Sequence, residues 1–305
     1  MQTTNNILLI RPSCFVFNTE TAASNAFQIK PNESDDVVKK FALTEFERFA
    51  ETLKNKGVNV FIFDDTEFPQ KPDAIFPNNW ITFHPDGNVI LYPMYARNRR
   101  CERRQDIIDA LRIKFEITSI TDLSVYEKDS KFLEGTGSIV FDHNSKVAYA
   151  CLSARTDKEL FITVCSLLNY KPVFFRADDK FGKEIYHTNV MMCIGNKFAV
   201  VCLDSISDKM EKEFVSHSLI NSGHQIIEIS FEQMNSFAGN MLELNTNQNK
   251  NILVLSQTAF DILESKQKTE IEKFCELVPV SINTIETIGG GSARCMIAEI
   301  FLKPK

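Results

Sequence analysis

The 305-residue chain lacks the features of several large protein classes. It has no run of eighteen uninterrupted apolar residues, so no transmembrane helix is predicted. Its 34 Lys and Arg against 40 Asp and Glu give a net charge of −6, and the missing basic surplus disfavours a nucleic-acid binder. The first residues, MQTTNNILLIRPSC, have neither the charged nor the apolar region of a signal peptide. We therefore expect neither a membrane nor a nucleic acid as partner.

Motifs for metals, phosphates and disulfide frameworks are also missing. The eight cysteines form no C-x-x-C pair, and the chain has neither a GxxxxGK[ST] loop nor an HExxH helix. Scattered cysteines are typical of free thiols in a reducing compartment, which predicts a cytoplasmic protein. We expect no metal and no cofactor.

A repeated pattern is present instead. Five amphipathic segments with apolar residues at helical spacing recur along the chain, at 35–56, about 98–112, 157–169, 207–222 and about 258–276. Each is followed by one short β-branched or aromatic strand, such as VNVFIF or PVFFRA. A polar loop and two more strands come next, such as GSIVF and KVAYACL. The pattern predicts five copies of a helix–strand–strand–strand unit.

The fifth copy is one strand short. It has CMIAEIFL and then ends, whereas NILLIRP at 6–12 is a strand without a module of its own. We expect this N-terminal strand to complete the last module, because a ring closed in this way leaves few exposed sheet edges. The expected architecture is an α/β ring forming a single domain over residues 1–305.

Polar residues stand at matching places before the second strand of each copy. They recur at intervals of 53 to 55 residues, as Asn79, Glu134, His187, Asn240 and Cys295. In a closed ring of like modules, equivalent positions face one axis, so we expect these side chains to converge. Three glycines precede the cysteine in IGGGSARCM, where the backbone must turn sharply or pass close to a ligand. Cys295 is therefore the candidate nucleophile.

At these positions the chain resembles the pentein superfamily of guanidino-modifying enzymes, which includes arginine deiminase, dimethylarginine dimethylaminohydrolase and the amidinotransferases. The matching pieces span the chain: DAIFPNNW (73–80), LEGTG (133–137), LSART (152–156), YHTNV (186–190), GNMLEL (239–244) and GGGSARCM (289–296). The DAIFPNNW form is similar to an amidinotransferase-like subgroup of citrulline-utilisation hydrolases. The resemblance implies a pseudo-symmetric five-bladed α/β propeller with a Cys/His/Glu catalytic set.

That set assigns a role to each residue. Cys295 adds to the resonance-stabilised carbon of a guanidino or ureido group, which divides a high barrier into two lower ones. His187 protonates the departing amine and then deprotonates the water that resolves the intermediate. Glu134 orients His187 and hydrogen-bonds the substrate's N–H groups, as the resemblance implies.

Other candidate residues bind the substrate. The glycine run, with Gly290 at its centre, would bring backbone groups within hydrogen-bonding range of the substrate, and Asn240 would face the same axis. Arg155 in LSART lies where the family places an arginine that grips the α-carboxylate in a bidentate fork. Within the basic run ARNRRCERR, Arg97 is retained as a second clamp, and the other arginines are expected on a solvated face.

The choice between a guanidino and a ureido substrate depends on Asp73, Asn78 and Asn79. Related guanidine hydrolases have a carboxylate near the position of Asn79, and the deiminase motif His-x-Asp is His187-Thr-Asn189 in this chain. Two carboxylates that would bind a guanidinium are thus replaced by amides, which suit a neutral ureido group. The sequence favours a citrulline-like substrate, although Asp73 can supply a carboxylate for a guanidinium.

Three classes of function stay open at this point: a hydrolase, an amidinotransferase that uses an amine in place of water, and a non-enzymatic binding propeller. The Cys/His/Glu set argues against the third. The other histidines, His84, His143, His217 and His224, show no partner pattern and are expected at the surface. The sequence does not decide the oligomeric state, and a homodimer stays among the options.

Overall fold

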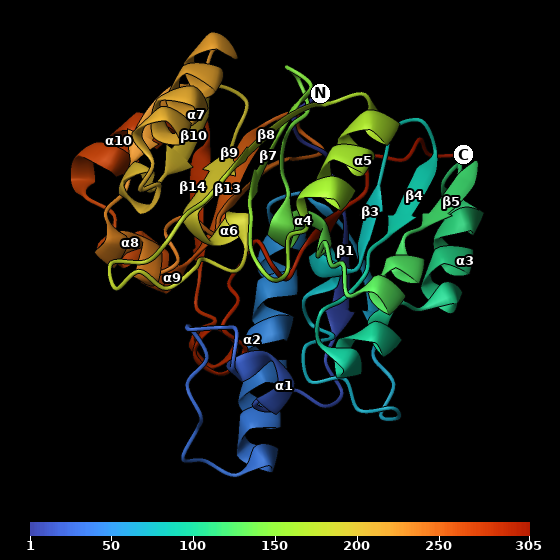
Figure 1. Ribbon diagram of the computed structural model, residues 1–305. Coiled ribbons are helices and arrows are strands. Elements are labelled where there is room, and N and C mark those ends of the chain that lie inside the picture. The colour runs from blue at the N-terminus through green and yellow to red at the C-terminus, as the bar shows by residue number, and fades with distance from the viewer.

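The computed structural model describes residues 1–305, whose strands form five three-stranded sheets around one axis (Figure 1). The sheets, in spatial order, are β15-β1-β2, β3-β4-β5, β6-β7-β8, β9-β10-β11 and β12-β13-β14. Their bounds are β1 Asn6–Arg11, β2 Asn59–Asp64, β3 Ile81–Phe83, β4 Asn88–Leu91, β5 Ser119–Asp122, β6 Val140–Asp142, β7 Val147–Cys151, β8 Lys171–Phe175, β9 Met192–Ile194, β10 Phe198–Val201, β11 Gln225–Glu228, β12 Leu242–Asn245, β13 Asn251–Ser256, β14 Glu276–Val280 and β15 Ala298–Glu299.

All five sheets have the same internal topology. The first two strands pair antiparallel, as Val140 of β6 does with Tyr149 of β7, and the third pairs parallel to the second, as β8 does with β7. A parallel neighbour needs a crossover connection, and a helix provides it. The repeating unit is therefore strand–strand–helix–strand. The predicted helix–strand–strand–strand unit was out of phase, because the strand after each helix returns to the preceding hairpin.

The first strand closes the ring, as the sequence predicts. Ile7 of β1 pairs antiparallel with Glu299 of β15 and parallel with Val60 of β2. The N-terminal strand is thus the central strand of the sheet that also holds the last strand. The predicted five-bladed α/β propeller is confirmed.

Helices cover the outside of the sheets (Figure 1). The α-helices are α1 Thr19–Ala22, α2 Asp35–Asn55, α3 Gln105–Lys114, α4 Gly135–Ser138, α5 Lys158–Leu168, α6 Thr188–Met191, α7 Lys209–Asn221, α8 Phe231–Asn235, α9 Gln257–Ile262 and α10 Ser265–Glu272. Four 3₁₀ segments are η1 Pro77–Asn79, η2 Arg97–Glu102, η3 Ser124–Asp129 and η4 Leu203–Ser205, and η5 Ile285–Gly289 is a π-helix. None of the helices is both long enough and apolar enough to span a bilayer.

The long helix α2 illustrates how the pattern becomes structure. Ser34 precedes it in an extended conformation, and Gly57 follows it with a φ of +85°, a conformation that favours glycine. Its apolar face includes the fully buried Phe46 and Phe49. Burying each of these side chains contributes roughly 1.5–3 kcal/mol.

Two predicted helices are interrupted. The segment expected at about 98–112 divides into η2 and α3, with Arg103 in an extended conformation between them. The segment expected at about 258–276 divides into α9 and α10, because Leu263 and Glu264 are extended and Glu264 forms a new capping box with Gln267. At the second break, local capping overrides the continuous apolar periodicity.

Short helical turns precede the inner strands and position the polar residues of the repeat. Glu134 is the N-cap of α4, and His187 is the N-cap of α6. Asn79 ends η1, so a comparable turn precedes β3. The segment Gly135–Ser138 (GTGS) forms the single helical turn α4. Three of the five repeat residues are thus placed by turns that lead into the first strand of a sheet.

Candidate active site

The five polar residues of the repeat do converge. Each is buried, with exposures of 3% for Asn79, 0% for Glu134, 3% for His187, 1% for Asn240 and 6% for Cys295. His187 Nε2 lies 2.8 Å from Glu134 Oε2, and Asn240 Nδ2 lies 3.3 Å from Cys295 Sγ. A Cβ on Gly137 would come within 2.4 Å of Asn79 Nδ2 and 2.8 Å of the His187 ring, so only glycine fits between them.

A cavity opens beside this cluster, and we call it the front cavity. It is lined by Thr21, Asn25, Asp73, Phe76, Asn79, Arg99, Arg155, Tyr186, His187, Gly289, Gly290, Gly291 and Cys295. Of the predicted residues, Glu134 and Asn240 stand behind this lining and contact it through His187 and Cys295. Asn78 and Arg97 do not line it.

The His187–Glu134 pair has the electrostatics of a general base and its orienting carboxylate. Burial lowers the pKa of His187 to about 4 despite the Glu134 hydrogen bond, so the imidazole is neutral near pH 7. Although burial alone would raise the pKa of Glu134, Arg155 and His187 hold it well below its usual range. The ionised carboxylate only accepts hydrogen bonds, which places the proton of the neutral ring on Nε2 and leaves Nδ1 as the acceptor.

Two side-chain amides contact the thiol of Cys295. Asn240 Nδ2 is 3.3 Å and Asn189 Nδ2 is 3.5 Å from Sγ. Asn240 Nδ2 also donates to the backbone carbonyl of Asn189 at 2.9 Å, which holds the two amides together. The thiol of Cys295 also lies 3.5 Å from Asn240 Oδ1, so both polar atoms of the Asn240 amide contact the sulfur.

The glycine run before Cys295 leaves a π-helix. Glu45 of α2 accepts hydrogen bonds from the backbone N–H groups of Thr284 and Ile285, and the chain leaves η5 through Gly290 with a φ of +64°. A Cβ on Gly289 would approach the Phe76 ring to 2.8 Å. Close packing against Phe76 thus requires glycine at 289, and the left-handed conformation favours glycine at 290. Turns of π-helix are frequent at functional sites.

The segment 18–29, which includes α1, covers the front cavity, and sequence reasoning missed it. Asn25 Nδ2 donates to the carbonyls of Gly290 at 3.2 Å and Gly289 at 3.4 Å, while Gln28 Nε2 donates to the carbonyl of Ile288. The segment has no apolar periodicity that would have indicated a packed element. Its contacts are mostly single polar bonds between distant parts of the chain, including one from the backbone N–H of Ile29 to the carbonyl of Thr287.

Arg155 is one of the fully buried side chains. Its guanidinium donates to Ser24 Oγ at 2.6 Å and to the carbonyl of Thr21 at 3.2 Å, and it lies 3.4 Å from Glu134 Oε2. It also stacks over the Tyr186 ring, with 4.8 Å between the guanidinium carbon and the ring centroid. Arg155 therefore ties the covering segment to the catalytic carboxylate.

Arg99, and not Arg97, is the arginine of the basic run that reaches the site. Arg97 is exposed, whereas Arg99 is 3% exposed and forms a two-bonded pair with Glu102, at 2.9 Å for each bond. Arg99 Nη1 donates to Asn79 Oδ1 at 2.8 Å. The Arg99-x-x-Glu102 spacing is the signal in the sequence that could have identified it.

This contact fixes the orientation of the Asn79 amide. A guanidinium only donates, so Asn79 Oδ1 must face Arg99 and Nδ2 must face away from it. Asn79 Nδ2 is buried and has no hydrogen-bond partner within the chain. Asn79 therefore presents a donor to the front cavity.

Asp73 presents the complementary acceptor. Its Oδ2 accepts from Asn18 Nδ2 at 2.8 Å and from Thr21 Oγ1 at 3.3 Å, and Arg99 Nε is 3.7 Å away. Its Oδ1 is buried without a partner in the chain. Burial raises the pKa of Asp73 against the opposing effect of Arg99. Asn78 is fully buried, and neither of its side-chain polar atoms has a partner.

The expectation that the other histidines lie at the surface was wrong for three of them. His84 and His224 are 4% and 5% exposed, and His143 is partly buried. His224 pairs with Asp142 at 2.9 Å. Only His217 is exposed. The inner strands and the turns beside them bring these residues inward, which isolated histidines in a sequence do not reveal.

Comparisons with known proteins agree with this architecture. The family model of N,N dimethylarginine dimethylhydrolase, eukaryotic, matches residues 11–302. No curated protein matches the chain. Among solved structures, the N-terminal domain of ArgZ, an arginine dihydrolase of the ornithine-ammonia cycle in Cyanobacteria, is similar at 17% identity with a TM-score of 0.74, covering 97% of this chain and 99% of that domain.

Two further structures place this likeness in context. Against the longer ArgZ chain the TM-score is 0.75 at 17% identity, and the match covers 98% of this chain but only 41% of ArgZ. A dimethylarginine dimethylaminohydrolase, solved as an adduct with S-methyl-L-thiocitrulline, gives a TM-score of 0.65 at 14% identity, covering 98% of this chain and 100% of the other. These likenesses establish the fold.

The match over nearly the whole chain, together with the closed five-sheet ring, decides the family. Members of this family hydrolyse C–N bonds of amidines that are not peptide bonds. The chain belongs to the N,N dimethylarginine dimethylhydrolase family of the pentein superfamily and is a hydrolase of this class.

Proposed function

We propose that the protein hydrolyses the ureido group of a citrulline-like amino acid through an intermediate linked to Cys295. The observation that carries this proposal is the orientation of Asn79, whose Oδ1 is occupied by Arg99 and whose Nδ2 has no partner. A ureido group has a carbonyl oxygen that accepts a hydrogen bond from this donor. A guanidinium has only N–H donors, which would oppose it.

Asp73 Oδ1 completes the recognition of a ureido group. This buried acceptor has no partner and lines the same cavity as Asn79. It suits an N–H of the ureido group while Asn79 Nδ2 binds the oxygen. One donor and one acceptor in the cavity therefore match the one acceptor and the several donors of the substrate.

The first half of the reaction transfers the proton of the Cys295 thiol to Nδ1 of His187. The thiolate, stabilised by Asn189 and Asn240, adds to the ureido carbon and forms the S–C bond. The tetrahedral adduct collapses as its C–N bond breaks and His187 protonates the departing nitrogen, which leaves as ammonia. A thiocarbamate then joins Cys295 to the rest of the amino acid.

The second half removes this thiocarbamate. Neutral His187 takes a proton from water, and the hydroxide adds to the carbonyl carbon. The C–S bond breaks, the thiol recovers a proton from His187, and a carbamic acid is released. The carbamic acid loses carbon dioxide to give the free amine, ornithine when the substrate is citrulline. Glu134 stabilises the imidazolium in both halves.

The groups that bind the amino-acid end of the substrate follow from the cavity lining. Arg155 is the cation proposed for the α-carboxylate, and it reaches the cavity between Tyr186 and the covering segment. In this structure Ser24 and the carbonyl of Thr21 occupy its N–H groups. The covering segment would therefore have to exchange these bonds for bonds to the substrate carboxylate.

A guanidino substrate is the second candidate, and Asp73 favours it. A buried carboxylate oxygen without a partner can balance a guanidinium charge. Hydrolysis of a guanidino group yields a ureido group with its new oxygen in the same site. The protein could then act on both groups in succession, as the name arginine dihydrolase describes for ArgZ.

Product analysis by mass spectrometry tests the proposal. The enzyme is incubated separately with citrulline, arginine, methylated arginines and agmatine, each with and without an added amine such as glycine. We expect ornithine, ammonia and carbon dioxide from citrulline, with a larger kcat/KM than for arginine. A tenfold or greater preference for arginine or a methylarginine would overturn the ureido assignment, and amidino transfer to the amine would overturn hydrolysis.

A further inference from the structure

Glu102 is a buried carboxylate beside the front cavity that the proposed mechanism does not use. It belongs to η2, as does Arg99, which lines the cavity. Arg99 is 3% and Glu102 2% exposed, and Nε and Nη2 of the guanidinium each donate to one carboxylate oxygen at 2.9 Å. The carboxylate of Glu102 has no other hydrogen-bond partner. Removing two charges from water is costly, so a buried pair is by itself weak evidence for a stabilising role.

Asp73 is a second carboxylate within reach of the same guanidinium. Arg99 Nε lies 3.7 Å from Asp73 Oδ2, against 2.9 Å from Glu102 Oε1, and Nη2 lies 3.4 Å from the backbone carbonyl oxygen of Asp73. A two-bonded contact with a carboxylate uses one edge of a guanidinium, and the edge formed by Nε and Nη2 is bound to Glu102. The two carboxylates therefore compete for this edge, and Glu102 holds it.

Asp73 keeps an unused acceptor as a result. Its Oδ2 accepts hydrogen bonds only from Asn18 and Thr21, and its buried Oδ1 has no partner. A guanidinium next to a buried carboxylate would ordinarily satisfy such an oxygen, because charge-assisted pairs of this type are strong. Burial raises the pKa of Glu102 and Arg99 opposes this effect, so the ionisation of Glu102 depends on the same pair.

We propose that Glu102 is a positioning residue for substrate recognition, which binds Arg99 and thereby keeps it away from Asp73. This arrangement has two effects at the cavity. Asp73 Oδ1 stays free to accept a bond from the substrate, and Arg99 Nη1 stays on Asn79 Oδ1, so that Asn79 Nδ2 remains the free donor. The part of Asp73 and Asn79 in binding the substrate rests on the proposed function, whereas the position of Arg99 does not depend on it.

Kinetics of Glu102→Gln test the proposal. Glutamine keeps the size of the side chain but removes its charge and one acceptor, so Arg99 should bind Asp73 instead. We expect kcat/KM on citrulline, or on the substrate that the product analysis identifies, to fall by about tenfold to a hundredfold, mainly through a higher KM.

A matched variant controls for the loss of a charge from this region. Glu127 forms a two-bonded pair with Arg103, which comes from the same basic run but does not line the front cavity. Glu127→Gln should therefore leave KM within a few-fold of the wild-type value. A rise in KM as large as that of Glu102→Gln would overturn the specific role of Glu102.

A second substitution separates this role from a purely structural one. Arg99→Gln added to Glu102→Gln removes the group that would capture Asp73, so kcat/KM should recover by at least about threefold relative to Glu102→Gln alone. If Glu102 only supported the fold, the second substitution would lower kcat/KM further, and that result would overturn the proposal.

Crystal structures without substrate give a measurement that does not depend on activity. In Glu102→Gln we expect Nε and Nη2 of Arg99 within hydrogen-bonding distance of the carboxylate of Asp73. If Glu102→Gln does not fold, Asp73→Asn takes its place, and Arg99 should then keep its bonds to both Glu102 and Asn79. An Arg99 that stays in place in the first variant, or that leaves Glu102 in the second, would overturn the proposal.

The failure of this inference can be told apart from the failure of the proposed function. If arginine proves to be the preferred substrate, the ureido assignment fails, but the movement of Arg99 in the crystal and the change in KM can still be measured. If citrulline is hydrolysed while KM is unchanged in Glu102→Gln, the proposed function holds and the role of Glu102 is refuted.

Discussion

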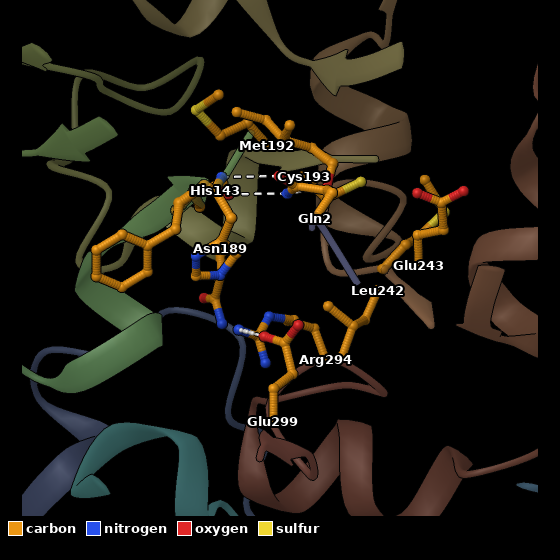
Figure 2. A pocket seen from close by; sticks show the side chains of 13 residues that line it. Gln2, His143, Asn189, Met192, Cys193, Leu242, Glu243, Arg294 and Glu299 are labelled. Carbon is orange, nitrogen blue, oxygen red and sulfur yellow. Dashed lines mark hydrogen bonds and ion pairs between the residues drawn. The ribbon is translucent and has the colours of Figure 1, made fainter. Parts of the chain in front are cut away.

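The front cavity has a cysteine and a histidine in its wall and a glutamate directly behind it, and a second cavity, the rear cavity, is lined by His143, Cys193 and Glu243 (Figure 2), yet only the front set is connected. In the front cavity His187 bonds the ionised Glu134. In the rear cavity His143 bonds the hydroxyl of Tyr170 at 2.6 Å. A phenol does not stabilise an imidazolium as a carboxylate does, so only the first histidine can accept and return a proton efficiently. The residue types alone therefore do not make a catalytic site.

The cysteines differ in the same way. Burial raises the pKa of Cys193 in the rear cavity to about 12. Cys295 receives two amide donors, from Asn189 and Asn240, and lies beside the cavity that holds the general base. Both thiols are buried, so what distinguishes Cys295 is its place beside the proposed general base.

The largest expected effect on turnover is the difference between substituting Cys295 and substituting Cys193. Cys295→Ser should lower turnover by at least about a thousandfold, since the covalent route is lost, whereas Cys193→Ser should leave it within a few-fold of the wild type. Iodoacetamide should label Cys295 first among the eight cysteines, and excess substrate should slow the labelling. Equal labelling of several cysteines with activity retained would contradict the assignment of the nucleophile.

The histidines give the next contrast. His187→Ala should lower turnover by at least about a hundredfold with the fold intact, because proton transfer loses its base. His143→Ala is the matched variant from the rear cavity, and its turnover should stay near that of the wild type. Circular dichroism checks the fold of both. Near-normal turnover in His187→Ala would show that convergence on the axis does not identify the base.

A smaller effect is expected at Asn79. Asn79→Asp removes the donor offered to a ureido oxygen and adds a carboxylate that can bind a guanidinium. The ratio of kcat/KM for citrulline to that for arginine should fall by about tenfold to a hundredfold, since one charge-assisted hydrogen bond contributes roughly 1.5–3 kcal/mol. An unchanged ratio would indicate that Asp73, and not Asn79, selects between the two substrates.

The smallest effect is a pH response that should be nearly absent. His187 acts as a base in its neutral form, and its pKa of about 4 keeps it neutral through the mildly acidic range. On citrulline, kcat/KM should therefore change little between pH 6.5 and 5, whereas with a histidine of ordinary pKa it would fall by about fifteenfold over the same interval. A fall centred near pH 6.5 with the fold intact would refute the lowered pKa.

The sequence predicts the ring and the converging residues because both depend on periodicity. Strands alternate with helices in all five repeats, and polar residues recur at nearly constant intervals, so equivalent positions had to meet at the axis. The sequence predicts less well which strands group into one sheet. A strand pattern does not say which neighbour it joins, and parallel pairing after a crossover moved each strand to the preceding hairpin.

The rest of the site depends on contacts that have no period. Arg99 lies in a basic run that resembles a solvated face, and only its partners Glu102 and Asn79 distinguish it from Arg97. Asn25 acts through the carbonyl of Gly290, and a contact between a side chain and a distant backbone leaves no local pattern. Such residues become visible only once the fold has brought separate segments together.

The pairing of β1 between β15 and β2 has a consequence for synthesis on the ribosome. The first strand emerges early, but its antiparallel neighbour is almost three hundred residues away in the chain. Until that neighbour leaves the exit tunnel, the nascent chain has an unpaired edge on β1 and no Cys295 near the axis. Closing so long a loop is slow and leaves strand edges open to other chains in the meantime. Activity should therefore appear in one step when the ring closes, and chains that stop before β15 should be inactive and prone to aggregate.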